Sequence, residues 1–185
     1  IRREIGTQGP CHLAGHSLGG LVAFEAARQL EALGCQTAFL GVLDNAAPAT
    51  APVACDDWDN SRWLRHVAIR LEKLYDVVLG VSNELTVDDL LARMLSAGLL
   101  PPGTSNSYLR SFIDVYCANA IAAARYRPEC RPLPGKITLF KASEEDAEVG
   151  VQAAQSEEDS LGWWRYADVG VEVISVSGTH ITMLA

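Results

Sequence analysis

Two short segments near the start of the chain are apolar almost without interruption, residues 9–15 and 35–44. Short apolar runs bounded by turn residues are typical of parallel β-strands that are covered on both faces. Between them, residues 18–34 repeat their apolar positions at the three- and four-residue spacing of a helix. The pattern therefore predicts strand, tight turn, helix and strand, a β-α-β unit with Ser17 at its first turn.

The periodicity becomes helical from about residue 56 to residue 128, with Thr86 and Asp89 spaced as a capping box. A helical block between sheet strands indicates a lid or a substrate-binding cap, with a structural flank as the alternative. Some of its large side chains could line an apolar tunnel, although apolar residues at helical spacing are more typical of a core. These residues are Trp58, Trp63, Leu71, Leu74, Tyr75 and Phe112.

Strand patterns return at residues 132–142 and 171–178, after the helical block. Alternating β and α elements predict an α/β fold with a doubly wound parallel sheet. We expect residues 1–55 and 129–185 to form the core that carries the sheet, with residues 56–128 inserted as a helical lid.

Composition and charge limit the classes of protein to which this chain could belong. A chain of 185 residues that is 49% apolar fits one globular domain, and no apolar run approaches the roughly 18 residues that span a bilayer. The net charge of −8 disfavours nucleic acid and anionic membranes as partners, and we expect a cytoplasmic protein. Five cysteines without a CxxC pair indicate reduced, buried thiols, not a disulfide framework or a metal site.

The segment AGHSLGG at residues 14–20 places Ser17 between Gly15 and Gly19. A nucleophilic serine on a strained strand-to-helix turn needs small neighbours, because the helix that follows approaches closely. The helix that begins near Leu18 would point free N–H groups at the site, so the Leu18 amide is a candidate oxyanion donor. The alternative is an ordinary glycine-rich turn with a satisfied hydroxyl.

A serine nucleophile needs a base, and the chain has four histidines. His12 lies inside a strand and is expected in the core, while His16 adjoins the serine and is expected to point elsewhere. His66 lies on the first helix of the block, where solvent exposure is the ordinary expectation. His180 follows the last strand in a loop that would reach the carboxyl edge of the sheet, so it is the candidate base.

Two carboxylates at strand ends could orient that base. Asp44 closes an apolar strand directly, where burial requires a partner such as a histidine. Asp146 follows the next strand in a stretch with seven acidic residues and no basic one between Glu144 and Asp159, which is typical of a solvated loop. The pattern favours Asp44 and keeps Asp146 as the alternative, since both preserve the chain order serine, acid, histidine.

The motifs AGHSLGG, GVLDNAAP, ITLFKASEE, LGWWRYA and SGTHITML resemble, in this order, the thioesterase domains that end nonribosomal peptide synthetases and polyketide synthases. The resemblance implies an α/β-hydrolase fold, with Asp44 as the acid of a triad with Ser17 and His180. Members of that family also have several strands before the serine turn, one loop of which gives a second oxyanion donor, and a final helix. We therefore expect residues 1–185 to be a partial domain.

The resemblance also implies a reaction. An acyl or peptidyl chain, held as a thioester on the phosphopantetheine of a carrier protein, would pass to Ser17 and leave by hydrolysis or macrocyclisation. The acyl or peptidyl carrier protein would be the partner, and no cofactor or metal would be bound by this domain. The alternatives are a discrete editing thioesterase, a small-ester esterase or lipase, and a non-catalytic truncated hydrolase module.

Overall fold

The computed structural model describes residues 9–48, 59–129, 131–144 and 159–184. It divides into two compact units, one formed by residues 1–52 with 125–185 and the other by residues 53–124. The expected function of the second unit as a lid stays a prediction.

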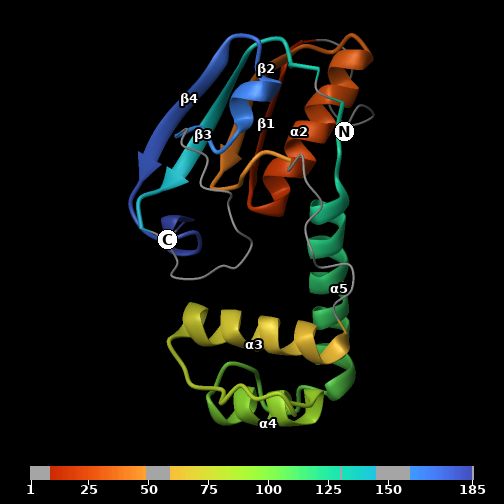
Figure 1. Cartoon of the computed structure of the whole chain (residues 1–185), viewed down its shortest axis with the longest axis vertical. Helices are drawn as coiled ribbons and strands as arrows, with labels where there is room; N and C mark the ends of the chain where they lie inside the picture. The colour runs from red at the N-terminus through yellow and green to blue at the C-terminus, as the bar shows by residue number, and fades with distance from the viewer. Residues whose placement is uncertain (1–8, 49–58, 130, 145–158, 185) are drawn as a thin grey trace. The chain divides into compact units, whose positions relative to one another are not determined.

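The first unit is built on a parallel sheet with the strand order β1-β2-β3-β4 (Figure 1). The predicted α/β fold is confirmed. Because parallel strands end at the same edge, the residues that follow β1, β2 and β4 meet there, although they are far apart in sequence. The strands are β1 (Cys11–His16), β2 (Thr37–Leu43), β3 (Lys136–Ala142) and β4 (Gly170–Val176).

Helix α2 (Leu18–Ala32) follows β1 and packs against β1 and β2. Its buried residues recur at helical spacing, and Phe24 is fully buried. The ring centroid of Phe24 lies 5.1 Å from that of Trp163, on the short 3-10 helix η1 (Trp163–Tyr166). The core of this unit therefore joins α2, the sheet and η1.

The second unit contains α3 (Asn60–Tyr75), α4 (Val87–Ser96) and α5, which runs on to Arg125 (Asn106–Arg125). The predicted capping box is confirmed at the start of α4, where Thr86 and Asp89 bond each other's backbone N–H groups. The three helices share one apolar core, to which each contributes buried residues. Among them are Val67, Leu71, Leu90, Met94, Leu109 and Ile113.

The predicted tunnel residues divide between core and surface. Trp63 and Leu71 are buried, as expected of core residues, whereas Leu74, Tyr75 and Phe112 are exposed. Trp58 lies outside the described residues. Cys11 and Cys35 are buried free thiols, as predicted, whereas the free thiol of Cys117 is only partly buried, and Cys55 and Cys130 lie outside the described residues.

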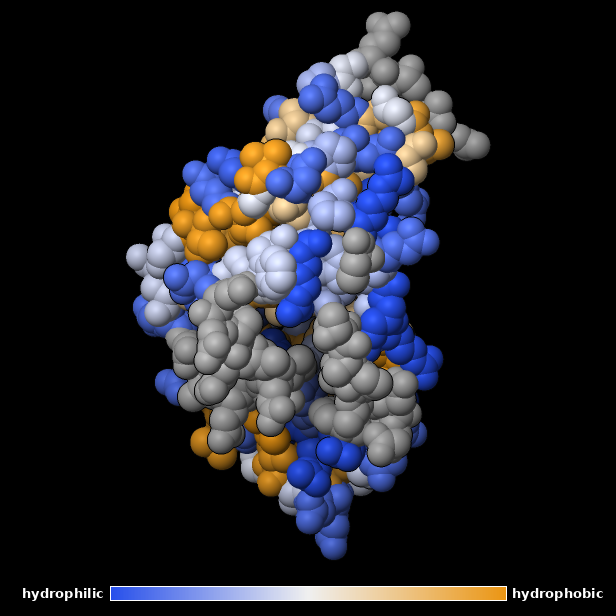
Figure 2. All heavy atoms as spheres, turned by 45° about the horizontal axis from the view of Figure 1, so that its top comes forward, coloured by the Kyte–Doolittle hydropathy of each residue, from blue (hydrophilic) through white to orange (hydrophobic). Residues whose placement is uncertain are grey.

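Polar side chains cover much of the surface and apolar patches interrupt them (Figure 2). The exposed apolar side chains include Val173 and Ile174 on β4 and Tyr108 and Val115 on α5. In the part of the chain that the structure describes, none of the helices has the length and apolar character needed to cross a membrane.

Candidate active site

Ser17 stands at the turn between β1 and α2 with φ 54° and ψ −129°, a conformation that is strained for a residue with a side chain. Two hydrogen bonds hold this backbone. The Ser17 N–H donates to the Leu43 carbonyl at 3.0 Å, and the Ser17 carbonyl accepts from the Gly20 N–H at 2.8 Å. The predicted strand-to-helix turn is therefore present, with the strain expected of a nucleophile elbow.

Gly15 and Gly20 make room for this turn, whereas the sequence predicts Gly15 and Gly19. A Cβ added at Gly15 would lie 1.9 Å from the Gly19 carbonyl oxygen, and one at Gly20 would lie 3.0 Å from Val42 Cγ1. A Cβ at Gly19 would meet nothing within 4 Å. The prediction that Gly19 supplies space is wrong, because its side-chain position points away from the helix–sheet contact that Gly15 and Gly20 allow.

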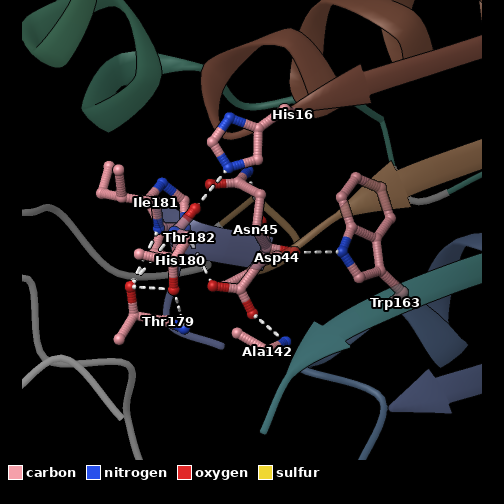
Figure 3. Close-up of polar contacts among 10 residues, drawn as sticks. His16, Asp44, Asn45, Ala142, Trp163, Thr179, His180, Ile181 and Thr182 are labelled. Atoms are coloured by element: carbon pink, nitrogen blue, oxygen red, sulfur yellow. Dashed lines mark hydrogen bonds and ion pairs between the residues drawn. The ribbon is translucent and has the colours of Figure 1, made fainter. Parts of the chain in front are cut away.

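His180 and Asp44 form a hydrogen bond, with His180 Nδ1 2.9 Å from Asp44 Oδ2 (Figure 3). Both side chains are only 18% exposed, so the pair is largely removed from water. The other carboxylate oxygen, Oδ1, accepts from the Ala142 N–H at 2.9 Å. The Asp44 N–H donates to the Phe140 carbonyl at 2.7 Å, which fixes a backbone with a positive φ of 48°. Neighbouring strand β3 thus aims the carboxylate at the imidazole.

Opposing effects set the pKa of Asp44. Burial alone raises the pKa of this carboxyl, but the hydrogen bonds from His180 and the Ala142 N–H and the nearby imidazoles of His180 and His16 outweigh it. The net result is a pKa below the ordinary value. Asp44 therefore stays ionised at neutral pH and accepts a hydrogen bond from the Nδ1–H of His180. The Nε2 atom of that ring is then free to take a proton.

The loop that carries His180 is held by its own threonines (Figure 3). Thr182 Oγ1 accepts from the Thr179 N–H at 2.8 Å, and Thr179 Oγ1 accepts from the Thr182 N–H at 3.3 Å. Gly178 lies at φ 101°, where an added Cβ would lie 2.6 Å from Thr182 Oγ1. These contacts hold the backbone on both sides of His180.

Trp163 anchors the turn that carries Asp44. This side chain is fully buried, and its Nε1–H donates to the Asn45 carbonyl at 2.7 Å (Figure 3). Because its ring also packs on Phe24, it connects the helix after the serine to the turn of the acid. The neighbouring Trp164 is 49% exposed.

His16 takes part in the site, contrary to the expectation that it points elsewhere. Its Nε2 lies 2.7 Å from the carbonyl oxygen of His180, and the two ring centroids are 4.6 Å apart at an interplanar angle of 32°. Topology places the last residue of β1 at the same sheet edge as the loop that follows β4, but no local sequence pattern indicates that these two residues touch.

Two further expectations about histidines are wrong. His12 is exposed, not in the core. His66 is half-buried in the helical unit, with Nε2 3.0 Å from the Tyr116 hydroxyl, and burial together with the charge of Arg70 lowers its pKa. The alternative acid, Asp146, lies outside the described residues.

The hydroxyl of Ser17 makes no hydrogen bond to any of the described residues. In free enzymes catalytic hydrogen bonds are often long, and they tighten when substrate binds. Leu18 is the first residue of α2, so its N–H has no partner within the helix. Its role as an oxyanion donor stays a prediction. Among the described residues, no group of three or more His, Cys, Asp or Glu side chains could hold a metal ion.

A strained serine between strand and helix, followed along a parallel sheet by an aspartate and a histidine that pair, defines the chain as a protein of the α/β-hydrolase type. The sequence matches the thioesterase domain family over residues 1–185, and the chain belongs to that family.

Among its relatives is the vanchrobactin synthetase VabF of Vibrio anguillarum, 42% identical over 90 residues, which are 49% of this chain and 3% of that protein. The structure resembles holo-AB3403, a four-domain nonribosomal peptide synthetase bound to AMP and glycine, with a TM-score of 0.78 and 27% identity. That match covers 98% of this chain and 14% of the synthetase.

The thioesterase domain of NocB, in covalent complex with a fluorophosphonate nocardicin G analogue, has the same fold, with a TM-score of 0.55 at 22% identity. That match covers 96% of this chain and 60% of the NocB domain. The chain therefore spans a small part of the synthetases and less than two thirds of the NocB domain.

Proposed function

We propose that this thioesterase domain releases an acyl or peptidyl chain from the phosphopantetheine thioester of a carrier protein through an ester on Ser17. The observation that carries the proposal is the Asp44–His180 hydrogen bond at the sheet edge where Ser17 occupies its strained turn. Membership of the thioesterase family supports the bond type, and the likeness to a vanchrobactin synthetase and to a four-domain nonribosomal peptide synthetase supports the carrier-bound substrate.

In the first step, Ser17 Oγ attacks the thioester carbonyl carbon while His180 Nε2 accepts the hydroxyl proton. The carbonyl oxygen becomes an oxyanion, and the Leu18 N–H at the positive end of α2 stabilises it. When the tetrahedral intermediate collapses, the carbon–sulfur bond breaks and the sulfur receives the proton from His180. The products are a free phosphopantetheine thiol and an ester on Ser17.

In the second step, water, or a hydroxyl or amine of the bound chain, attacks the ester while His180 removes its proton. The serine oxygen then leaves and receives that proton. Water yields a free acid, and an internal nucleophile yields a macrocycle. Asp44 acts in both steps by holding the imidazole tautomer and by stabilising the imidazolium that forms.

The test begins with covalent labelling by a fluorophosphonate, the reagent class found in the NocB complex. The wild-type chain should form one phosphonate ester, and Ser17→Ala should form none. The matched control is Ser96→Ala, because Ser96 is exposed on α4 in the other unit and bonds only within its own helix. Labelling that persists in Ser17→Ala contradicts the proposal.

Substrate class is tested by comparing three substrates of one acyl chain: an acyl-carrier protein, an N-acetylcysteamine thioester and a small oxygen ester. The proposal expects the largest kcat/KM with the carrier. A preference for the oxygen ester would identify an esterase. Fast hydrolysis of short acyl groups alone from the carrier would identify an editing thioesterase.

A further inference from the structure

We propose that His16 is a positioning residue for His180, and that it sets the separation between the nucleophile and the base. The inference rests on the proposed function, in which Ser17 and His180 react together. His16 joins the chain segments that carry Ser17 and His180. His16 is covalently bonded to the residue that carries the nucleophile, and its side chain bonds the backbone of the residue that carries the base.

The geometry restrains His180 at three points. Asp44 holds Nδ1 of the ring, His16 Nε2 lies 2.7 Å from the carbonyl oxygen of the same residue, and the His16 ring lies against the His180 ring at 4.6 Å. A carbonyl oxygen accepts only, so His16 must carry its proton on Nε2 and donate. The first contact leaves the ring free to pivot about the Asp44 bond. The ring contact opposes that pivot, and the His16 hydrogen bond fixes the backbone that carries the ring.

The backbone of His16 leads directly into Ser17. The strained φ of 54° at Ser17 fixes where its hydroxyl points relative to β1, on which His16 is the last residue. Since the two catalytic residues lie on segments separated by more than 160 positions, a contact that joins the segments directly determines their distance. Misplacement of reacting groups by about 1 Å can slow an enzyme about a hundredfold.

Three substitutions separate the donor from the ring. Glutamine places an amide N–H where His16 has Nε2, so His16→Gln keeps the donor without the ring. His16→Phe keeps a ring without the donor, and His16→Ala keeps neither. The matched control is His12→Gln on the same strand, since His12 is exposed and its only described ring contact is with Phe39.

The measurement is single-turnover acylation of the full chain by an N-acetylcysteamine thioester, with the saturating rate separated from the apparent KM. Loss of one neutral hydrogen bond should slow acylation about 3- to 10-fold in His16→Phe and more in His16→Ala, with an unchanged KM. His16→Gln should recover most of the rate, and His12→Gln should equal wild type. A second readout is the downfield proton resonance of His180 Nδ1–H, which should broaden or shift in His16→Phe and His16→Ala.

Two results would overturn the inference. One is an acylation rate and a proton resonance in His16→Ala that match wild type. The other is a His16→Gln rate as low as that of His16→Ala, which would show that the donor does not matter. Both are distinct from failure of the proposed function, in which wild-type protein itself neither reacts with the thioester nor is labelled at Ser17.

Discussion

The substitution Trp163→Phe tests whether the acid turn depends on a single indole N–H. Trp163 is fully buried and donates to the Asn45 carbonyl at 2.7 Å, one residue after Asp44. Phenylalanine keeps an aromatic ring against Phe24 but has no donor and a smaller volume. Trp164→Phe is the matched control, because Trp164 is 49% exposed and its contact with Arg165, 5.1 Å from the ring centroid, needs only an aromatic face.

Two costs add in Trp163→Phe. A carbonyl left without its donor costs about 1–3 kcal/mol, and the lower end applies to Asn45 because this group is only partly buried. The smaller ring leaves a cavity that costs a part of the about 3–5 kcal/mol typical of Trp→Ala. We therefore expect a free energy of unfolding lower by about 2–4 kcal/mol, and a change within about 0.5 kcal/mol for Trp164→Phe.

Urea unfolding followed by circular dichroism gives the two midpoints, and fluorophosphonate labelling without urea gives the reactivity of Ser17 in the folded state. We expect Trp163→Phe to unfold at lower urea and also to label more slowly, because the Asp44 turn is less well fixed. Equal midpoints for the two variants, or a lower midpoint with an unchanged labelling rate, would refute the anchoring role.

Three further predictions concern the acid, the helical unit and the serine turn. Asp44→Asn should lower kcat/KM for thioester hydrolysis by about a hundredfold or more, because the asparagine amide disfavours the required tautomer of the base; an unchanged rate would assign the acid elsewhere. Its carboxyl has a lowered pKa, so its contribution to stability is present above about pH 3.8 and is lost as pH falls through the lower folded pKa. The pKa of His66 is also lowered in the folded protein. As pH falls, this histidine therefore binds a proton in the unfolded chain before it does so in the folded one. Wild-type stability should thus decrease below about pH 6.5, and a smaller decrease in His66→Gln, measured by urea midpoints, checks the assignment. Gly15→Ala should abolish labelling of soluble protein because its Cβ meets backbone at 1.9 Å, whereas Gly19→Ala should label normally; equal labelling would contradict the packing described for the turn.

The sequence predicts the elements of this fold because each has a strong local signal. Continuous apolar runs mark the strands, and the spacing of Thr86 and Asp89 marks the start of α4. Once the strands are parallel, the positions of Ser17, Asp44 and His180 at one edge follow from topology alone. The sequence therefore predicts that these three residues share one edge of the sheet, but not which side chains touch.

The details that sequence reasoning missed depend on side-chain directions and long-range packing. The contact of His16 with His180 joins residues 164 positions apart, and that of Trp163 with Asn45 joins residues 118 apart. No local pattern records such pairs. The wrong prediction for Gly19 has the same cause. Only the direction in which a Cβ would point relative to the sheet shows that Gly20, and not Gly19, supplies the space.

The order of the site residues along the chain has a consequence for biosynthesis. The proposed nucleophile and acid, Ser17 and Asp44, come before the helical unit of residues 53–124, and the proposed base, His180, comes after it. During vectorial translation, a growing chain therefore contains Ser17 long before it contains His180. Under the proposed function, His180 can activate Ser17 only after the inserted helices and strands β3 and β4 have been made.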